Sequence, residues 1–117
     1  MRHPIPLIFN YLEDMYISLD FAKKHLNIQP TFTDDDTYIS FIIEGAEQAV
    51  LETCNLQDFS EIAVNGELPN AVKFAILLLV GDMYANRETV AYTTISKIPT
   101  FRYLLANFTK YNDPNLD

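Results

Sequence analysis

Residues 71–85 place the strongest constraint on how this chain folds. The only plainly polar residues in this segment are Lys73 and Asp82, and Pro69 stands where a helix would begin, a position at which its missing N–H is harmless. A helix that is apolar nearly all round has to be enclosed by other elements. Its longest unbroken apolar run, Phe74 to Val80, is far below the roughly 20 residues that cross a bilayer. The segment therefore predicts the core helix of a helical bundle and no membrane span.

A second long helix is expected over residues 34–54. Thr33 is the predicted N-cap, and Asp34, Asp35 and Asp36 follow in the first turn, where the helix dipole favours carboxylates. Asn55 is expected to end the helix. Apolar or small residues recur at helical spacing and predict a buried stripe, while three acidic residues are expected to face outward. The stripe comprises Ile39, Ile42, Ile43, Ala46, Ala49, Val50 and Cys54, and the outward residues are Glu44, Glu47 and Glu52.

Shorter elements are expected on either side of the two long helices. Ser18 predicts the N-cap of a short helix that ends before Pro30, and a single turn of helix is expected around Phe59 and Ile62. Asn65-Gly66 predicts a left-handed turn. Pro99 predicts the start of a closing helix. The buried stripe of that helix is expected to comprise Phe101, Leu104, Leu105, Phe108 and Tyr111.

The predicted fold is all-α: a small helical bundle with two long antiparallel helices, short flanking helices and an extended loop near residues 89–98. We expect the long helices, near 34–54 and 69–88, to cross at Gly45 and Gly81, because a missing side chain lets two backbones approach closely. Residues 15–112 form one predicted domain. Residues 1–14 are either an N-terminal arm or an upstream extension, since Met15 could be an alternative start, and 113–117 are a tail.

Charge and composition exclude several classes of function. A net charge of -8 repels phosphate backbones and anionic lipids, so sequence-specific nucleic-acid binding and membrane binding are not expected. One cysteine, Cys54, and two histidines, His3 and His25, cannot supply a Cys/His metal site. Three glycines leave no room for a phosphate-binding loop. The two prolines in the first ten residues argue against an export signal.

No catalytic constellation follows from the remaining polar residues. The acidic run at 34–36 is explained better by helix capping than by a metal, His25 is expected on the surface, and Cys54 lies on a buried stripe. We therefore expect no enzyme activity, no cofactor and no metal. Residue chemistry alone predicts a small acidic helical interaction module.

Asp82 breaks the apolar pattern of the core helix and needs a partner. One possibility is that it lies on a wet stripe with Asn86, four residues on. The other is a contact with Arg87 or Arg102 on another helix or another subunit. Both readings remain open at this point.

Two segments have no evident use in a monomer. Residues 7–12 carry apolar side chains outside the periodic core, and residues 89–98 are β-branched and aromatic in an otherwise helical chain. An unpaired strand edge is a template for another copy, and head-to-tail pairing of identical subunits closes a ring when the rotation per step allows it. The predicted subunit-interface residues are Leu7, Phe9, Tyr11, Asp82, Arg87, Tyr92, Thr94 and Arg102.

The order of several segments resembles the phage head-tail connector family, the gp6-like DNA-packaging adaptors of tailed phages and prophages. The resemblance covers residues 16–111. It is carried by YISLDFAKKHLNI at 16–28, the acidic residues 34–36, YISFIIEGA at 38–46, LPNAVKFAILLLV at 68–80 with Tyr84 and NRE at 86–88, and IPTF at 98–101 followed by Leu104 and Leu105. Residues 1–14 and 56–67 have no counterpart in the family.

The resemblance implies a structural virion component without catalysis. Copies would form a ring beneath the portal, expected to be dodecameric there, that extends the DNA channel and docks neck or tail completion proteins. The implied partners are further copies, the portal protein and the next neck or tail protein. The implied location is the virion neck, with the host cytoplasm during assembly. The competing reading is a small acidic interaction or regulatory module.

Overall fold

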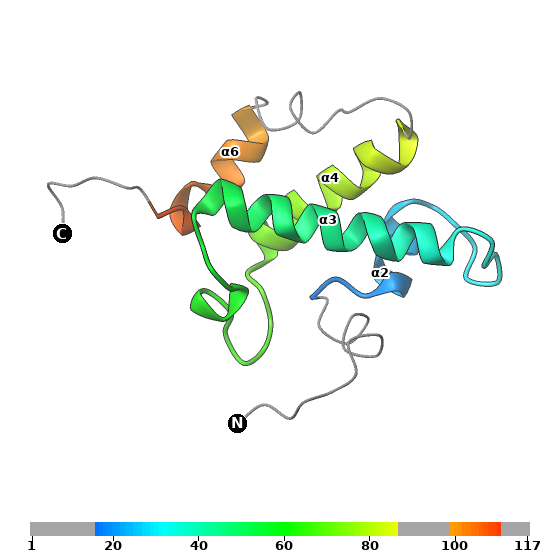
Figure 1. Cartoon of the computed structure of the whole chain (residues 1–117), viewed down its shortest axis with the longest axis horizontal. Helices are drawn as coiled ribbons and strands as arrows, with labels where there is room; N and C mark the ends of the chain where they lie inside the picture. Colours follow the sequence, from blue (N-terminus) through cyan, green and yellow to red (C-terminus); the bar gives the residue numbers. More distant parts are fainter. Residues whose placement is uncertain (1–15, 87–98, 111–117) are drawn as a thin grey trace, which may run out of the picture.

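The computed structural model describes residues 16–86 and 99–110 of the chain. Their regular secondary structure is helical, with one isolated bridge between Val64 and Glu67 and no strand among the described residues (Figure 1). The elements in chain order are α2 (Leu19–His25), α3 (Asp36–Cys54), the 3-10 helix η1 (Phe59–Glu61), α4 (Asn70–Ala85), α6 (Pro99–Leu105) and the 3-10 helix η2 (Ala106–Phe108). The predicted all-α class is confirmed, whereas residues 1–14, 89–98 and 113–117 lie outside the described parts.

The core lies where α3 and α4 pack against each other. The two helices run in opposite directions and cross obliquely (Figure 1). α3 presents the apolar stripe that the sequence predicts. α4 was expected to be enclosed nearly all round, whereas Phe74 on this helix is 46% exposed. The apolar side chains between the two helices are removed from water. Those with no exposed surface are Ile39, Ile43, Ala46, Val50 and Cys54 on α3, and Val72, Ala75, Ile76, Leu79 and Val80 on α4.

The predicted crossing at two glycines is wrong. Gly45 is exposed, and a Cβ built there would meet nothing within 4 Å outside its own helix. A Cβ on Gly81 would meet only the His25 ring, 3.5 Å from its Nε2. The helices are instead separated by the branched and aliphatic side chains of the core, so neither glycine is needed for close approach.

The acidic run before α3 ties helices together instead of capping one. Thr33 is not the N-cap: α3 begins at Asp36, and Asp35 occupies the cap position without a side-chain cap hydrogen bond. Asp35 Oδ2 accepts a hydrogen bond from the Tyr84 hydroxyl on α4 (2.6 Å). Asp36 Oδ1 pairs with the buried Lys23 ammonium of α2 (2.8 Å). Two of the three carboxylates therefore fix α2 and α4 to the start of α3.

The predictions for the start of α2, the end of α3 and the turn at Asn65-Gly66 are confirmed. The Ser18 hydroxyl accepts the N–H of Phe21 (3.1 Å) and caps α2. Asn55 ends α3 with a left-handed φ of 59°. Asn65 and Gly66 form the predicted left-handed turn with φ of 55° and 78°. Each of these conformations depends on one or two side chains, which is why the sequence predicts them.

The closing helix is shorter than its stripe predicts. α6 ends at Leu105 and continues as the single turn η2, after which Thr109 is extended. Phe101 and Leu105 are fully buried, and α6 packs on α4. The chain is then held at the end of α3, because the N–H of Lys110 donates to the Cys54 carbonyl (2.8 Å). That docking replaces a further turn of α-helix towards Tyr111.

Candidate functional site

Most of the predicted interface residues cannot be placed. Of the eight, Leu7, Phe9, Tyr11, Arg87, Tyr92 and Thr94 lie outside the described residues. Asp82 and Arg102 are described, on α4 and α6, and the structure forms no ion pair between them. The eight residues therefore remain predicted interface positions.

Asp82 takes the Asn86 partner, one of the two predicted alternatives. The Asn86 side-chain amide donates to Asp82 Oδ1 (3.2 Å) and to the Asp82 backbone carbonyl (3.1 Å). The second carboxylate oxygen, Oδ2, is buried and has no hydrogen-bond partner in the described parts of the chain. Half of this carboxylate is therefore left without a hydrogen bond.

Glu47 is the polar residue that sequence reasoning misplaced. It is only 8% exposed, although it was expected to face outward with Glu44 and Glu52. Its Oε2 accepts the backbone N–H groups of Tyr16 (2.8 Å) and Ile17 (2.9 Å), about thirty residues earlier in the chain. Burial raises the pKa of Glu47 to about 7, the neighbouring Glu44 carboxylate adds to this, and the two backbone hydrogen bonds oppose it.

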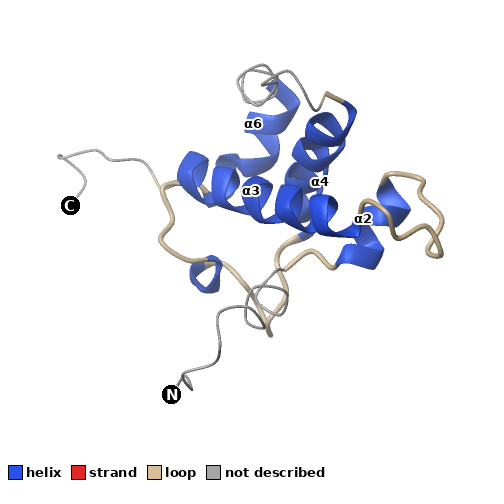
Figure 2. Cartoon of the chain, turned by 45° about the vertical axis from the view of Figure 1, so that its right-hand side comes forward, coloured by secondary structure: helices blue, strands red, loops and turns tan. Residues whose placement is uncertain are grey.

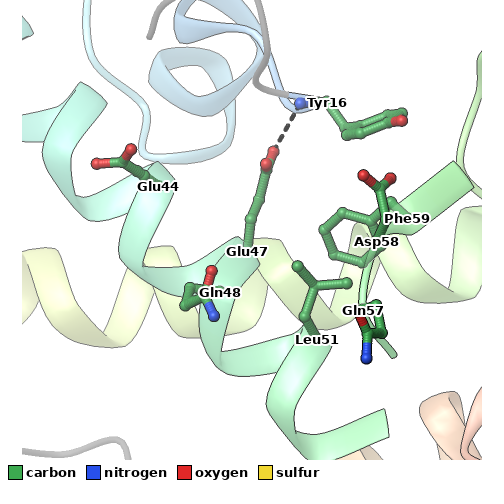
Figure 3. A pocket seen from close by; sticks show the side chains of 8 residues that line it. All are labelled: Tyr16, Glu44, Glu47, Gln48, Leu51, Gln57, Asp58 and Phe59. Carbon is green, nitrogen blue, oxygen red and sulfur yellow. Dashed lines mark hydrogen bonds between the residues drawn. The ribbon is translucent and has the colours of Figure 1, made fainter. Parts of the chain in front are cut away.

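A pocket of about 170 Å³ opens beside the Glu47 carboxylate (Figure 3). α3 supplies one wall, with Glu44 and Glu47 one turn apart. The segment entering η1 supplies Asp58 and Phe59, and Tyr16 completes the wall from the start of the described chain. The Tyr16 and Phe59 rings meet edge to face, with centroids 5.4 Å apart. Carboxylates and aromatic rings thus line one small depression.

The cysteine, histidine and acidic side chains that could have supported catalysis or metal binding do not form a site in the described residues. Burial raises the pKa of Cys54, which keeps this fully buried thiol protonated and unreactive. His25 is exposed. Within residues 16–86 and 99–110, no group of three or more His, Cys, Asp or Glu side chains is arranged to hold a metal ion. What the pocket can do is accept a cationic group, because its ionisable lining is acidic.

The outer surfaces of the helices carry several large apolar side chains. Phe41 on α3 is 65% exposed and Tyr103 on α6 is 81% exposed; Phe21, Phe74 and Phe32 are exposed as well. They are distributed over α2, α3, α4 and α6 and the loop before α3. Exposed aromatic residues of this size are common in protein–protein contacts.

Comparisons with known proteins agree with this fold. A search of curated proteins found no match. Among solved structures, the chain is similar to the "Crystal structure of bacteriophage HK97 gp6", with a TM-score of 0.64 and 21% sequence identity over 86% of this chain and 98% of that one. At this identity the likeness shows the fold.

Two further observations bear on the class of protein. In the described parts of the chain, no helix combines the length and the apolar character that crossing a membrane requires. Residues 16–110 match the sequence model described as "Phage gp6-like head-tail connector protein". That match spans all the described residues, from the Glu47-bound segment at Tyr16 to the docked Lys110. The chain therefore belongs to the family of phage gp6-like head-tail connector proteins.

Proposed function

We propose that this protein is a structural head-tail connector of a tailed phage or prophage that assembles into a ring beneath the portal. The ring extends the DNA channel and offers a platform for neck or tail completion proteins. The observation that carries the proposal is the family match over residues 16–110. The chain also folds like HK97 gp6, over 86% of its own length and 98% of that chain.

The charge of the chain suits a channel for DNA. Sixteen acidic residues oppose eight Lys and Arg, so a lumen lined by copies of this chain has few cations to bind phosphates. DNA–protein affinity comes largely from such cation–phosphate contacts. A passing duplex therefore meets a surface that does not retain it. The proposed location is the virion neck, reached by assembly in the host cytoplasm.

Subunit contacts are proposed for the segments singled out from the sequence. Residues 1–14 and 89–98 are expected to touch a neighbouring copy, as are Asp82 and Arg102 on the described helices. A chain lacking residues 1–14 should keep its helical circular dichroism and assemble more weakly. Assembly and portal binding equal to those of the parent would place the contacts on the helix faces instead.

Light scattering over a range of concentrations tests the proposed function directly. The chain is measured alone and after mixing with the portal protein from the same gene cluster, and the products are imaged by negative-stain electron microscopy. We expect ring-shaped particles in the mixture with the portal protein, whether or not the chain also forms them alone. A chain that stays monomeric in both conditions, and does not bind the portal, refutes the connector role.

A further inference from the structure

The turn at Asn65 and Gly66 places two groups side by side that can react with each other. It lies in the loop between η1 and α4, which extends away from the helices on the side opposite α6 (Figures 1 and 2). Both residues are exposed. Within the described residues, neither the Asn65 side-chain amide nor the Gly66 N–H takes part in a hydrogen bond. A carboxamide and the backbone nitrogen that follows it are therefore both accessible to water.

An asparagine followed by glycine can close a ring with its own backbone. The Gly66 nitrogen attacks Asn65 Cγ, the Cγ–Nδ2 bond breaks, and Nδ2 leaves as ammonia with the proton that the Gly66 nitrogen has lost. The product is a five-membered succinimide. Water then opens the ring at either carbonyl carbon, which gives aspartate or isoaspartate at residue 65. The net reaction consumes one water and releases one ammonia.

The turn already holds part of the geometry that ring closure requires. Val64 and Glu67 exchange both backbone hydrogen bonds (2.8 and 3.0 Å) around a two-residue turn. The φ angles of 55° at Asn65 and 78° at Gly66 make it a type I′ turn. The succinimide ring fixes ψ of residue 65 at about −120°, which with a φ of about +60° is the first position of a type II′ turn. Rotation of the single peptide unit between the two central residues interconverts these turns, so the ring can close while Val64 and Glu67 stay paired.

Two other asparagines with the same backbone conformation provide a comparison. Asn27 and Asn55 also have left-handed φ, of 64° and 59°. The nitrogens that follow them are occupied, because the N–H groups of Ile28 and Leu56 donate to backbone carbonyls of the preceding helices (2.8 and 2.9 Å). Each of these nitrogens also stands beside a branched side chain, whereas Gly66 has none. Asn65 therefore differs from both in having a nucleophile that is free and unhindered.

We propose that Asn65 is a site of spontaneous deamidation in the folded chain, through a succinimide formed with Gly66. The reaction adds one negative charge close to Glu67, whose carboxylate pairs with the Lys73 ammonium (2.6 Å). Isoaspartate also adds one carbon to the backbone of the turn, which no longer matches the tight two-residue connection between Val64 and Glu67. This modification is independent of the connector role.

Peptide mapping of the aged full-length chain tests the site. The chain is kept at pH 6 and at pH 8, digested at acidic pH and analysed by mass spectrometry, and isoaspartate is detected with an isoaspartate-specific methyltransferase. We expect deamidation and isoaspartate in the peptide containing Asn65, faster at pH 8 because the attacking nitrogen must lose a proton. Asn27 and Asn55, in the same digests, should keep their amides. An unchanged Asn65, or equal rates at the three asparagines, overturns the proposal.

Two variants test the chemistry of the turn. Asn65→Gly keeps residues that suit a type I′ turn and removes the carboxamide, so no isoaspartate should form there. Gly66→Asn keeps a residue that tolerates positive φ and places a side chain beside the nitrogen, so the reaction at Asn65 should slow severalfold. A rate in Gly66→Asn equal to that of the parent overturns the proposal. Circular dichroism checks that each variant is folded.

Urea identifies the state of the chain that reacts. The rate at Asn65 is measured at several urea concentrations below the unfolding transition. A rate that stays constant supports reaction within the folded turn. A rate that rises in proportion to the unfolded fraction places the reaction in the unfolded chain and overturns the proposal.

Discussion

Glu47→Gln provides a quantitative test of the buried carboxylate. A rise of its pKa from 4.5 to about 7 means that the folded chain holds a proton between these values which the unfolded chain has released. Stability from this group is therefore fully present below about pH 4.5 and is lost as the pH rises through about 7. At 1.36 kcal/mol per pH unit, the span corresponds to about 3 kcal/mol at most. Glutamine keeps an acceptor for the N–H groups of Tyr16 and Ile17 and does not ionise.

We expect Glu47→Gln to gain about 2–3 kcal/mol relative to the parent between pH 4.5 and pH 8. The assay is urea unfolding followed by circular dichroism at pH 4.5, 6, 7 and 8, at a concentration where both chains share one assembly state. Differences between the two chains cancel the titration of all other groups. Glu52→Gln is the matched control, because the same change is made at an exposed residue of the same helix that does not contribute to the pKa shift of Glu47. Parallel stability curves for parent and Glu47→Gln would show that Glu47 ionises freely in the folded chain.

Two further predictions concern stability. Lys23→Ala should lower the free energy of unfolding, measured in urea, by about 2–4 kcal/mol, because it leaves Asp36 without its buried partner. Lys24→Ala, at an exposed neighbour, should change it by less than about 0.5 kcal/mol. Equal effects of the two substitutions would contradict the buried pair. Gly45→Ala should raise the free energy of unfolding by up to about 1 kcal/mol, because a Cβ at this position meets nothing within 4 Å. A loss of stability would instead support a close helix crossing at Gly45.

The parts of the fold that sequence could predict are those set by neighbouring residues. The cap at Ser18, the left-handed end at Asn55 and the turn at Asn65-Gly66 each depend on conformations that one or two side chains favour. The apolar stripe of α3 depends only on helical periodicity. These features were sufficient for the all-α fold. The family was identified by the resemblance of the ordered sequence segments, which these features alone do not supply.

The positions that were predicted wrongly are those whose burial or bonding is set by a residue far away in the sequence. Asp36 pairs with Lys23 across thirteen residues, so the acidic run resembled a cap until α2 was placed beside it. Glu47 is buried because the chain at Tyr16 and Ile17 crosses over it. A signal for Glu47 was available: it stands four residues after Ile43 and three before Val50, which is the spacing of the buried stripe. Its charge obscured that pattern, because burial of a carboxylate is expected only where hydrogen bonds compensate it.

The attachment of both ends of the described chain to α3 has a mechanical consequence. Tyr16 and Ile17 are held by the Glu47 side chain, while the Lys110 N–H is held by the Cys54 carbonyl and its own carbonyl accepts the Asn55 side-chain amide. Along the helix, Glu47 and Cys54 are about 10 Å apart, at 1.5 Å per residue. A pull on either terminal segment is therefore transmitted to the same two turns of one helix. Tension applied at one end and resisted at the other would load this short stretch of α3 and spare the α3–α4 core.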